Sequence, residues 1–330
     1  MSNLKKQKKI FKQSTSKNSK LRVLKSGDTI EIIAPGSSAP MINLEKGAEI
    51  LRSWGYKVIF DKDILNPQLY LAQSDQYRFE AFKKAITNKN SQAIWCLRGG
   101  YGANRLLPQI QKMAIPKNKK LLIGYSDICS LHTVLNQKWK WPSLHGALID
   151  RLGEGTLSLE NMNELNKSLT EDLFSATFSN LVPLNKAAMK AKKIQSKVAG
   201  GNLLVITSTL GTPSQINLKN KILFLEEISE RAYRIDRCLQ QLKQSGVLDK
   251  AQAVVFGQFV NCQEKNGEDL VPKTLTHFFE KLKIPAFIGI NTGHGVEQRP
   301  LFFNTPAVLT CGKSAQMVVY SDYEVLKPRK

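Results

Sequence analysis

Ser126 lies in the stretch LLIGYSDICS, residues 121–130, where an apolar strand is expected to turn into a helix. Gly124 permits a tight turn, and Ile128 and Leu131 recur at helical spacing, so the helix should begin directly after the serine. A side chain on such a turn is exposed and faces helix N–H groups, which can stabilise an oxyanion. Position 128 breaks the G-x-S-x-G pattern of the α/β-hydrolases, and a serine that only caps the helix is the alternative. This stretch alone leaves Ser126 open between helix cap and nucleophile.

A serine nucleophile needs a base, and the chain has four histidines. His132 falls on the apolar face of its helix and His277 lies in another expected helix, so both are interpreted as structural. His145, in SLHGALID, is expected in a loop that could line a cleft. His294 follows the expected strand PAFIGIN and lies between two glycines, which let the backbone approach a ligand and leave the imidazole uncovered. His294 is therefore the stronger candidate base.

A histidine base needs an acid that fixes its tautomer, and KILFLEE places Glu226 and Glu227 at the end of an apolar strand. Adjacent residues of a strand point to opposite faces, so only one of the two is expected to reach the site. Salt bridges to the arginines of the following segment, Arg231, Arg234 and Arg237, are the alternative for either. The order serine, glutamate, histidine, each at a strand end or loop, indicates a hydrolytic triad more strongly than any member does alone.

The composition is that of an ordinary soluble globular protein, with 42% hydrophobic and 23% charged residues in 330. This length is sufficient for two domains. No apolar run approaches the roughly 20 residues of a membrane span, and no apolar segment of the kind found in secretory signals follows the basic N-terminus. Five scattered cysteines without a CxxC pair argue against a zinc site and against a disulfide framework, so we expect reduced cysteines in a cytoplasmic protein without a metal.

The formal net charge of +21 is concentrated in part at the N-terminus. The first 22 residues contain eight lysines and arginines and no acid. A segment that is also rich in Ser, Asn and Gln cannot bury enough apolar surface to fold, so we expect a solvated, disordered tail. Weak contact of this tail with an anionic surface is the functional alternative. No nucleic-acid motif with interleaved aromatic residues occurs elsewhere, so no nucleic-acid partner is expected.

Strands and helices are expected to alternate over about the first 150 residues, which predicts a parallel sheet with helices on both faces. Functional sites of such sheets are built from loops at the carboxyl ends of the strands. Three glycine-containing loops, APGSS, RGGYG and GYSD, fall at such ends.

The pattern changes near residue 180, where NKAAMKAKKIQSKVAGG is basic, poor in aromatics and ends in a glycine pair, as is typical of a linker or crossover. Several short strands and one strong helix, YRIDRCLQQLKQSG, follow. The fold class is therefore predicted to be α/β, with a parallel N-terminal domain and a β-rich C-terminal α+β domain. The predicted parts are a disordered basic tail (1–22), an N-terminal domain with the nucleophile (23–170), a linker or crossover (171–198) and a C-terminal domain with the glutamate and histidine (199–330).

Eight segments between about residues 24 and 326 share their order with a known protein family. They are GDTIEIIAPGSS, AIWCLRGGYGANRLL, LLIGYSDICSLH, SLHGALI, GGNLLVITSTLGTP, ILFLEEISERAYRIDRCLQQL, VVFGQF and PAFIGINTGHGVEQRPLFFN. As a set they resemble the LD-carboxypeptidases, serine peptidases that use a Ser-Glu-His triad. The family fold is a parallel, flavodoxin-like α/β domain followed by a β-rich domain, which agrees with the division above.

The resemblance implies a role for each residue that matches a family motif. Ser126 would be the nucleophile, His294 the general base and Glu226 the carboxylate that orients the base. The backbone N–H groups of Gly100 and Asp127 would form the oxyanion hole, a device whose donors each contribute roughly 10²–10³ in rate.

RGGYG also contributes candidates for substrate binding. Tyr101 lies in this loop, and Arg98, together with Arg234 elsewhere, is a candidate on position alone for a cationic clamp on the free carboxylate of the substrate.

The substrate that the resemblance implies is a murein tetrapeptide, from which the terminal D-alanine is removed during cytoplasmic cell-wall recycling. It also implies a homodimer that needs no cofactor. The run HGALI departs from the family's usual HGPM-like run, which puts a substrate contact near His145 in doubt, and the basic tail is additional. The alternatives are the related immunity hydrolases that cleave peptide-nucleotide antibiotics, and a basic protein that binds nucleic acid or anionic membrane through its tail.

Overall fold

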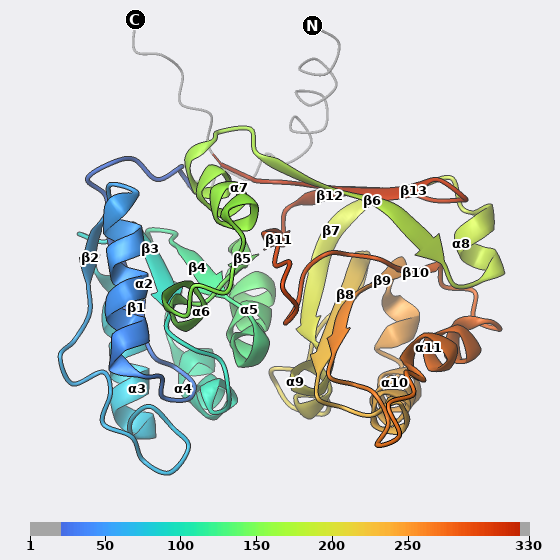
Figure 1. The fold of residues 1–330 in the computed structure, drawn as a ribbon, viewed down its shortest axis with the longest axis horizontal. Coiled ribbons are helices and arrows are strands. Elements are labelled where there is room, and N and C mark those ends of the chain that lie inside the picture. Colours follow the sequence, from blue (N-terminus) through green and yellow to red (C-terminus); the bar gives the residue numbers. More distant parts are fainter. Residues whose placement is uncertain (1–20, 324–330) are drawn as a thin grey trace, which may run out of the picture.

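The computed structural model describes residues 21–323, and the fold consists of two sheets that lie side by side with helices packed around them (Figure 1). The predicted disordered tail, 1–22, lies outside the described residues except for its last two. Those two are not disordered: Leu21 is buried and bridges to Tyr323, and Arg22 forms an ion pair with Asp28 at 2.7 Å. Among residues 21–323, no helix is long and apolar enough to cross a membrane.

The first sheet has six strands in the order β11-β5-β4-β3-β1-β2. Five are parallel to one another, and β11 joins the edge antiparallel to β5. The order β2-β1-β3-β4-β5 is that of flavodoxin-like folds, as predicted. The bounds are β1 (Thr29–Ile33), β2 (Lys57–Ile59), β3 (Ala93–Cys96), β4 (Leu121–Gly124), β5 (Ser143–His145) and β11 (Leu301–Phe303).

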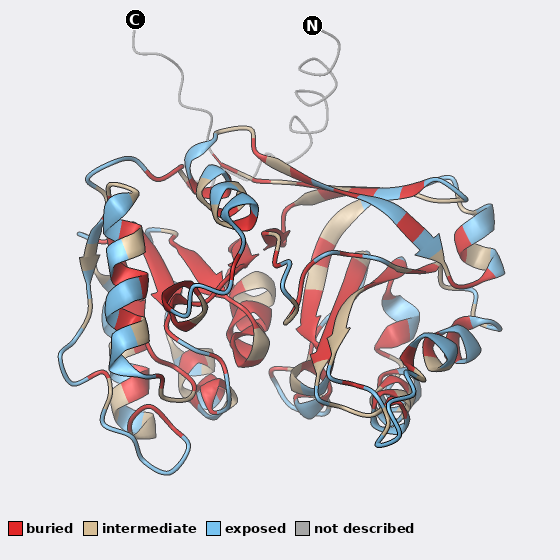
Figure 2. Ribbon diagram, viewed as in Figure 1, coloured by how far each residue is buried: buried red, intermediate tan, exposed pale blue. Residues whose placement is uncertain are grey.

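Helices cover both faces of this sheet because its strands are apolar on both sides. Ile30 and Ile32 of β1 pack with α2, α6 and α7, whereas Ile33 packs on the opposite side with α3, α4 and α5. The buried strands between partly exposed helices are visible in Figure 2. The bounds are α2 (Met41–Ser53), α3 (Asp75–Thr87), α4 (Leu107–Lys112), α5 (Cys129–Val134), α6 (Ile149–Gly153) and α7 (Leu159–Thr170).

The second sheet is a closed barrel in the order β10-β6-β13-β12-β7-β8-β9. Strands β7 to β10 run parallel, and the other neighbours are antiparallel. The bounds are β6 (Ser175–Pro183), β7 (Lys193–Asn202), β8 (Lys221–Ile228), β9 (Ala253–Val260), β10 (Ala286–Ile288), β12 (Pro306–Thr310) and β13 (Ala315–Tyr320). The predicted fold class, a parallel α/β half with a strand-rich second half, is confirmed.

Helices α9, α10 and α11 pack on the outside of this barrel, against the outward apolar residues of β8 and β9. Their bounds, with that of the short α8, are α8 (Lys186–Lys190), α9 (Leu203–Ser208), α10 (Ala232–Gln244) and α11 (Val271–Phe279). Single turns of 3-10 helix and one π-helical turn complete the structure: η1 (Ala103–Leu106), η2 (Ser126–Ile128), the π turn η3 (Leu135–Trp139) and η4 (Leu248–Lys250).

The segment 171–198, predicted to be a linker or crossover, is instead part of the barrel. It contains β6, α8 and the first residues of β7, all within the closed sheet or packed on it. The polar and basic residues of this segment resemble those of a linker, but they are the outward-facing residues of strands. In β6, buried and exposed residues alternate through Ala176, Thr177 and Phe178.

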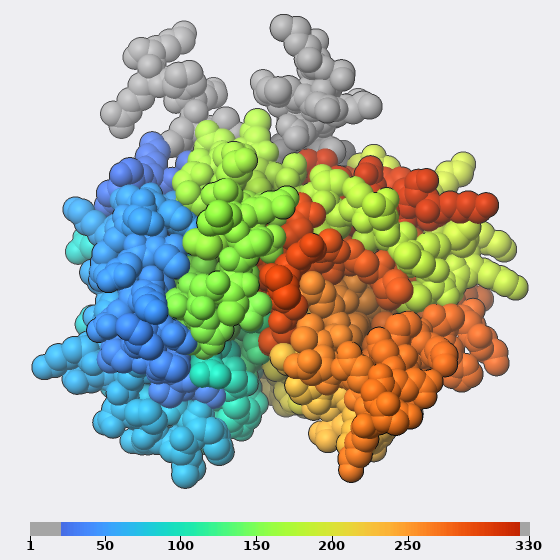
Figure 3. All heavy atoms as spheres, in the orientation of Figure 1, coloured from blue at the N-terminus to red at the C-terminus, as the bar shows by residue number. Residues whose placement is uncertain are grey.

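The two halves are not separate in sequence or in core. β11, from the C-terminal part of the chain, completes the first sheet, and one hydrophobic cluster contains both Ile32 of β1 and Phe224 of β8. Figure 3 shows the N-terminal half in blue beside the C-terminal half in yellow to red, with the green segment between them in this view.

Candidate active site

Ser126 follows β4 and begins the 3-10 turn η2 that leads into α5. Its φ of 63° lies in the left-handed region, which L-residues seldom adopt, and such strain is concentrated at functional sites. The serine side chain forms no capping hydrogen bond to η2 or α5, since the residues before these segments are Tyr125 and Ile128 and neither end has a side-chain cap. The capping interpretation is therefore unsupported, and the strained strand-to-helix turn favours a nucleophile.

The three glycine-containing loops that were predicted at the carboxyl ends of the strands lie against one another. A Cβ on Gly99 would lie 2.7 Å from the Cβ of Ser126, so only glycine permits this approach. A Cβ on Gly36 would clash with the carbonyl oxygen of Gly99 and lie 3.2 Å from Oδ2 of Asp127. The backbone N–H of Ser37 donates to the carbonyl of Gly99 at 2.9 Å. The loops after β1, β3 and β4 thus form one compact surface around the serine.

The side chain of Asp127 holds the glycine loop to the serine turn. Its Oδ2 accepts a hydrogen bond from the N–H of Ala103 at 2.7 Å, and the residue is buried. Burial raises the pKa of this carboxyl to about 7, although the Ala103 bond and the charge of Arg78 act in the opposite direction. The side chain therefore has a positioning role. The proposed use of the Asp127 and Gly100 amides as oxyanion donors remains a prediction.

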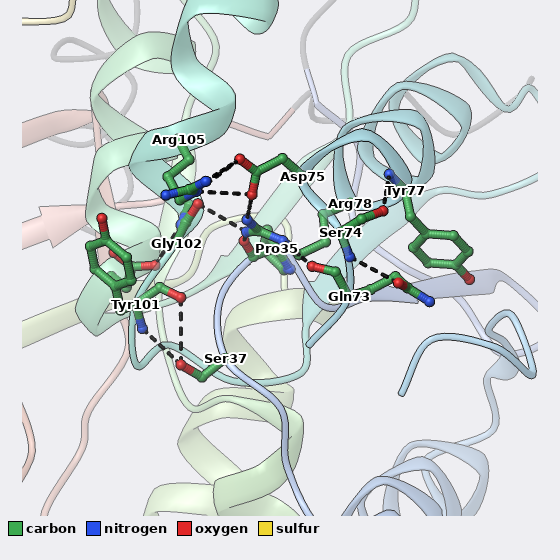
Figure 4. Close-up of polar contacts among 12 residues, drawn as sticks. Pro35, Ser37, Gln73, Ser74, Asp75, Tyr77, Arg78, Tyr101, Gly102 and Arg105 are labelled. Atoms are coloured by element: carbon green, nitrogen blue, oxygen red, sulfur yellow. Dashed lines mark hydrogen bonds and ion pairs between the residues drawn. The ribbon is translucent and has the colours of Figure 1, made fainter. Parts of the chain in front are cut away.

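Arg78, on α3, holds these loops in place through hydrogen bonds to their backbone carbonyls (Figure 4). Its buried guanidinium donates to the carbonyl of Pro35, to that of Gly102 at 2.9 Å and to that of Gln73 at 3.0 Å. It also pairs with Asp75 at 2.5 Å. One side chain thereby connects the loop after β1, the glycine loop after β3 and the start of α3.

The remaining candidates from the glycine loop lie at the surface. The guanidinium of Arg98 donates to the carbonyl of Ser38 at 3.2 Å and approaches Asp150 at 3.4 Å, with 44% of its side chain exposed. Tyr101 is 42% exposed and packs edge-to-face on Tyr70. Both are accessible to a ligand, but their contacts do not test a role in binding.

Arg234, the other arginine suggested as a clamp, lies in the first turn of α10 in the second half. Its guanidinium pairs with Glu230 at 2.5 Å, and not with Glu226 or Glu227, for which salt bridges to the arginines of this segment were the alternative. Its role as a clamp remains a prediction.

The strand end of β8 and the GHG loop bring Glu226 and His294 together. Oε2 of Glu226 lies 2.6 Å from Nδ1 of His294, and the glutamate is fully buried. Burial alone would lower the pKa of His294, but the charge of Glu226 and its hydrogen bond outweigh burial and leave the pKa raised. Because Nδ1 is engaged, Nε2 remains as the ring nitrogen that can exchange a proton with substrate.

Glu227 points the other way, as strand alternation requires. Its Oε1 accepts from the side-chain amide of Asn202 at 2.7 Å, and its Oε2 from the N–H of Leu204 at 2.8 Å in the first turn of α9. Burial, followed by the charge of Glu226, raises the pKa of Glu227 to about 7. Glu226 is therefore the carboxylate that faces the histidine.

One contact between the two halves at the site is made by Tyr125, the residue before Ser126. Its ring packs edge-to-face against the imidazole of His294, with ring centroids 4.7 Å apart. Among residues 21–323, no hydrogen bond joins Ser126 Oγ to His294. The three predicted residues thus converge on one region, with glutamate and histidine bonded and the serine next to the tyrosine that touches the histidine.

The other histidines have structural surroundings. His132 is buried and its Nε2 lies 2.9 Å from the carbonyl of Gly124, and burial lowers its pKa to about 4. His145, expected in a loop lining a cleft, lies in β5 and is fully buried, in contact with the rings of Tyr125 and Phe303. The expectation of a cleft position for His145 was wrong. His277 is exposed on α11.

Residues that the sequence interpretation missed hold the GHG loop in place. Arg151 of α6 donates to the carbonyl of Gly295 at 3.0 Å, which ties this loop to the first half. The N–H of Gly295 donates to Oε1 of Gln258 at 2.8 Å. Gln258 lies in VVFGQF, one of the segments that matched the family, and this was the signal that could have identified it. Arg151, like Arg78, binds backbone carbonyls that no pattern in the sequence specifies.

Similarity to known proteins covers both halves of the chain. The sequence profile of the LD-carboxypeptidase N-terminal domain matches residues 30–146, and that of the LD-carboxypeptidase C-terminal domain matches residues 195–309. A putative carboxypeptidase of Rickettsia conorii is 36% identical over 252 residues, 76% of this chain and 78% of the relative. A probable murein peptide carboxypeptidase of Bacillus subtilis is 32% identical over 285 residues, 84% of this chain and 88% of the relative.

Two further comparisons bear on substrate class. The crystal structure of a muramoyltetrapeptide carboxypeptidase from Oxalobacter formigenes has a TM-score of 0.78 and 29% identity, and the match covers 90% of this chain and all of that one. The microcin C7 self-immunity protein of Escherichia coli is 25% identical over 296 residues, 81% of this chain and 86% of the relative.

Proposed function

This chain belongs to the LD-carboxypeptidase family, and from that premise we propose that it is a serine-type carboxypeptidase that cleaves the L-D peptide bond of murein tetrapeptides and releases the terminal D-alanine. Relatives named for murein peptides or muramoyltetrapeptides support this substrate class. The observation that carries the mechanism is the 2.6 Å contact between His294 Nδ1 and the buried Glu226, beside the strained turn that presents Ser126.

In the proposed first half-reaction, Oγ of Ser126 attacks the scissile carbonyl while Nε2 of His294 takes its proton. Glu226 stabilises the imidazolium that forms. The tetrahedral oxyanion is held by the N–H groups of Gly100 and Asp127. Collapse breaks the C–N bond, and the histidine returns its proton to the amine of D-alanine, which leaves an acyl-enzyme and free D-alanine.

In the second half-reaction, water enters where D-alanine has left. His294 takes a proton from the water, whose oxygen attacks the ester carbonyl. Collapse of the second tetrahedral intermediate returns the proton to Ser126 Oγ and releases the tripeptide. Arg98 and Tyr101, both exposed beside this site, are proposed to contact the substrate. A location in the cytoplasm, a role in peptidoglycan recycling and a homodimeric state remain predictions from the family resemblance.

Ser126→Ala tests this function on purified murein tetrapeptide. We expect D-alanine release to fall by about 10⁴-fold or more, because the nucleophile is removed and the rest of the triad cannot replace it. Ser53→Ala, which removes an exposed hydroxyl at the end of α2, is the matched control and should leave the rate unchanged. Release of D-alanine by Ser126→Ala at the wild-type rate would exclude the assignment.

A second candidate substrate is a peptide-nucleotide antibiotic, and the likeness to the microcin C7 self-immunity protein favours it. The same triad would serve, since only the group on the leaving side differs. Wild-type kcat/KM measured on tetrapeptide and on an aminoacyl-sulfamoyl nucleoside separates the two. A higher value on the nucleoside would replace the murein proposal.

A further inference from the structure

A polar cavity of about 250 Å³ lies where the end of α5 and η3 meet the barrel strands β7 and β8. It is distinct from the catalytic residues: Lys221 begins β8 at the cavity, and Glu226 lies five residues further on, about 16 Å along an extended strand. Both halves of the molecule contribute to it. The lining residues are Thr133, Asn136, Gln137, Lys140, Val198, Ala199, Gly200, Ile216, Asn217, Lys219, Asn220, Lys221 and Asn304.

All charged side chains that line this cavity are positive. Three lysines line it, Lys140 from the first half and Lys219 and Lys221 from the second, and no aspartate or glutamate is among the lining residues. Lys197 of β7 lies opposite Lys221 in the register of the two parallel strands and adds a fourth positive charge nearby. Like charges that converge on a concave surface without a counter-charge repel one another, and an anion would relieve this repulsion.

Lys221 is the most buried of the three lysines that line the cavity. It is half-buried, and its Nζ donates to Oδ1 of Asn304 at 3.2 Å, a neutral acceptor. Burial, followed by the charges of Lys197 and Lys140, lowers the pKa of this ammonium to about 8. Two of the three protons of Nζ therefore have no acceptor among the residues described, and the ammonium has no anionic partner.

The walls of the cavity are fixed by hydrogen bonds between the halves. Gln137 donates through Nε2 to the carbonyl of Gln215 at 2.8 Å and accepts through Oε1 from the N–H of Asn217 at 2.9 Å. Nζ of Lys140 donates to the carbonyl of Gln137 at 2.5 Å, which fixes the position of this lining lysine. A site held by such bonds is formed before a ligand arrives.

We propose that this cavity binds a small phosphate-bearing anion, with Lys221 and Lys219 from the barrel half and Lys140 from the α/β half as its cationic contacts. Several ammonium groups around a small volume suit the spread charge of phosphate or diphosphate oxygens. A ligand held by both halves would also stabilise their association, because it binds only where both are folded. The inference is independent of the proposed hydrolysis.

Calorimetric titration of the full chain with inorganic pyrophosphate tests the site. We expect saturable binding at one site per chain. Lys140→Met and Lys221→Met should each weaken it about tenfold, since each removes one charge-assisted contact. Lys186→Met removes an exposed charge of α8 outside the cavity and should leave the affinity unchanged. Citrate, which has comparable charge but only carboxylates, should bind more weakly.

Three outcomes would overturn the proposal: no saturable binding of pyrophosphate, equal weakening by Lys186→Met, or citrate binding as tightly as pyrophosphate. Circular dichroism checks that each variant is folded. Should the half-buried Lys221→Met fail to fold, the exposed Lys140→Met decides the question. Lys140→Met should retain D-alanine release, so failure of the anion site and failure of the proposed function are distinguishable.

Discussion

Two adjacent glutamates at the end of β8 have opposite environments. Glu226 lies against His294 at 2.6 Å, whereas Glu227 accepts hydrogen bonds from Asn202 and from the first turn of α9. Both are buried, so each must be compensated: the first by an imidazole that can become cationic, the second by neutral donors. Two neighbouring residues of β8 therefore have different roles: Glu226 is proposed for catalysis, and Glu227 holds the first turn of α9.

The pH dependence of hydrolysis follows from the raised pKa of His294. In the proposed mechanism only the neutral imidazole accepts the proton of Ser126, so activity should be present above the pKa and should be lost as pH falls through it. The acid limb of kcat/KM should therefore have its midpoint above 6.5, the ordinary value for histidine. Glu226→Gln should lower the rate by about 10⁴-fold and move this midpoint to lower pH, because the charge that raises the pKa is gone. D-alanine release measured from about pH 5 to pH 9 checks both effects.

Glu227→Gln is the matched control for that change. Its charge also raises the pKa of His294, but it ranks below Glu226 as a cause, so the acid limb should move less and the rate should fall far less. Equal shifts and equal losses in the two variants would contradict the assignment of Glu226 as the orienting carboxylate.

The sequence indicates the residues of the proposed triad, but it does not indicate the side chains that hold their loops in place. Ser126, Glu226 and His294 could be recognised in the sequence because each lies at the end of an apolar strand or just after one and matches a family motif. Arg78 and Arg151 could not, because their partners are the carbonyls of Pro35 and Gly295, and a backbone carbonyl carries no side-chain signature.

Among the elements, the loops after β1 and β3 depend on one side chain of α3. Arg78 is nearly fully buried and satisfies three backbone carbonyls while pairing with Asp75. The glycine loop contacts Ser126 through Gly99, so its position determines where the proposed oxyanion donors lie. A buried guanidinium in α3 thus acts on the site without touching substrate.

Arg78→Met should leave those carbonyls without donors and destabilise the protein by about 3 kcal/mol. Because the glycine loop loses its support, kcat should fall by about 10²-fold while KM changes less. Chemical denaturation and steady-state kinetics on murein tetrapeptide measure the two effects.

Arg105→Met serves as the comparison, since Arg105 also pairs with Asp75 but is 43% exposed. It should destabilise the protein far less than Arg78→Met, because an exposed ion pair contributes little to stability, and it should leave kcat unchanged. A loss of kcat in Arg105→Met equal to that in Arg78→Met would refute the role given to the buried arginine.

The elements themselves were predictable where burial is complete. β3 and β4 are buried on both faces and appear as continuous apolar runs, AIWC and LLIG. β6 and β7 were missed because one face of each is polar: in β7, Lys193 is exposed and the outward lysines resemble those of a linker. β11 has only three residues, too few for a periodic signal, and its partner β5 is far away in the sequence.

The whole molecule is held together by a core that the two halves share. One hydrophobic cluster contains Trp95 of β3 and Phe287 of β10, and β11 pairs across from the second half to the first. Separate unfolding of either half would expose part of this cluster and leave β5 without its antiparallel neighbour.

Unfolding should therefore occur in one transition. All four tryptophans, Trp54, Trp95, Trp139 and Trp141, lie in the first half, so their fluorescence reports on that half alone, whereas far-UV circular dichroism reports on both. We expect the two signals to give the same midpoint in a denaturant titration. Two resolved midpoints would show that the halves unfold independently.

The position of β11 has a consequence for synthesis on the ribosome. The N-terminal half leaves the exit tunnel first and begins to fold, but the outer edge of β5 stays open until Leu301–Phe303 emerge. His294 emerges only shortly before them, so a nascent chain carries Ser126 long before it has a base. Completion of the sheet and arrival of the proposed base thus coincide during translation, and a nascent chain shorter than this carries the proposed nucleophile without the proposed base.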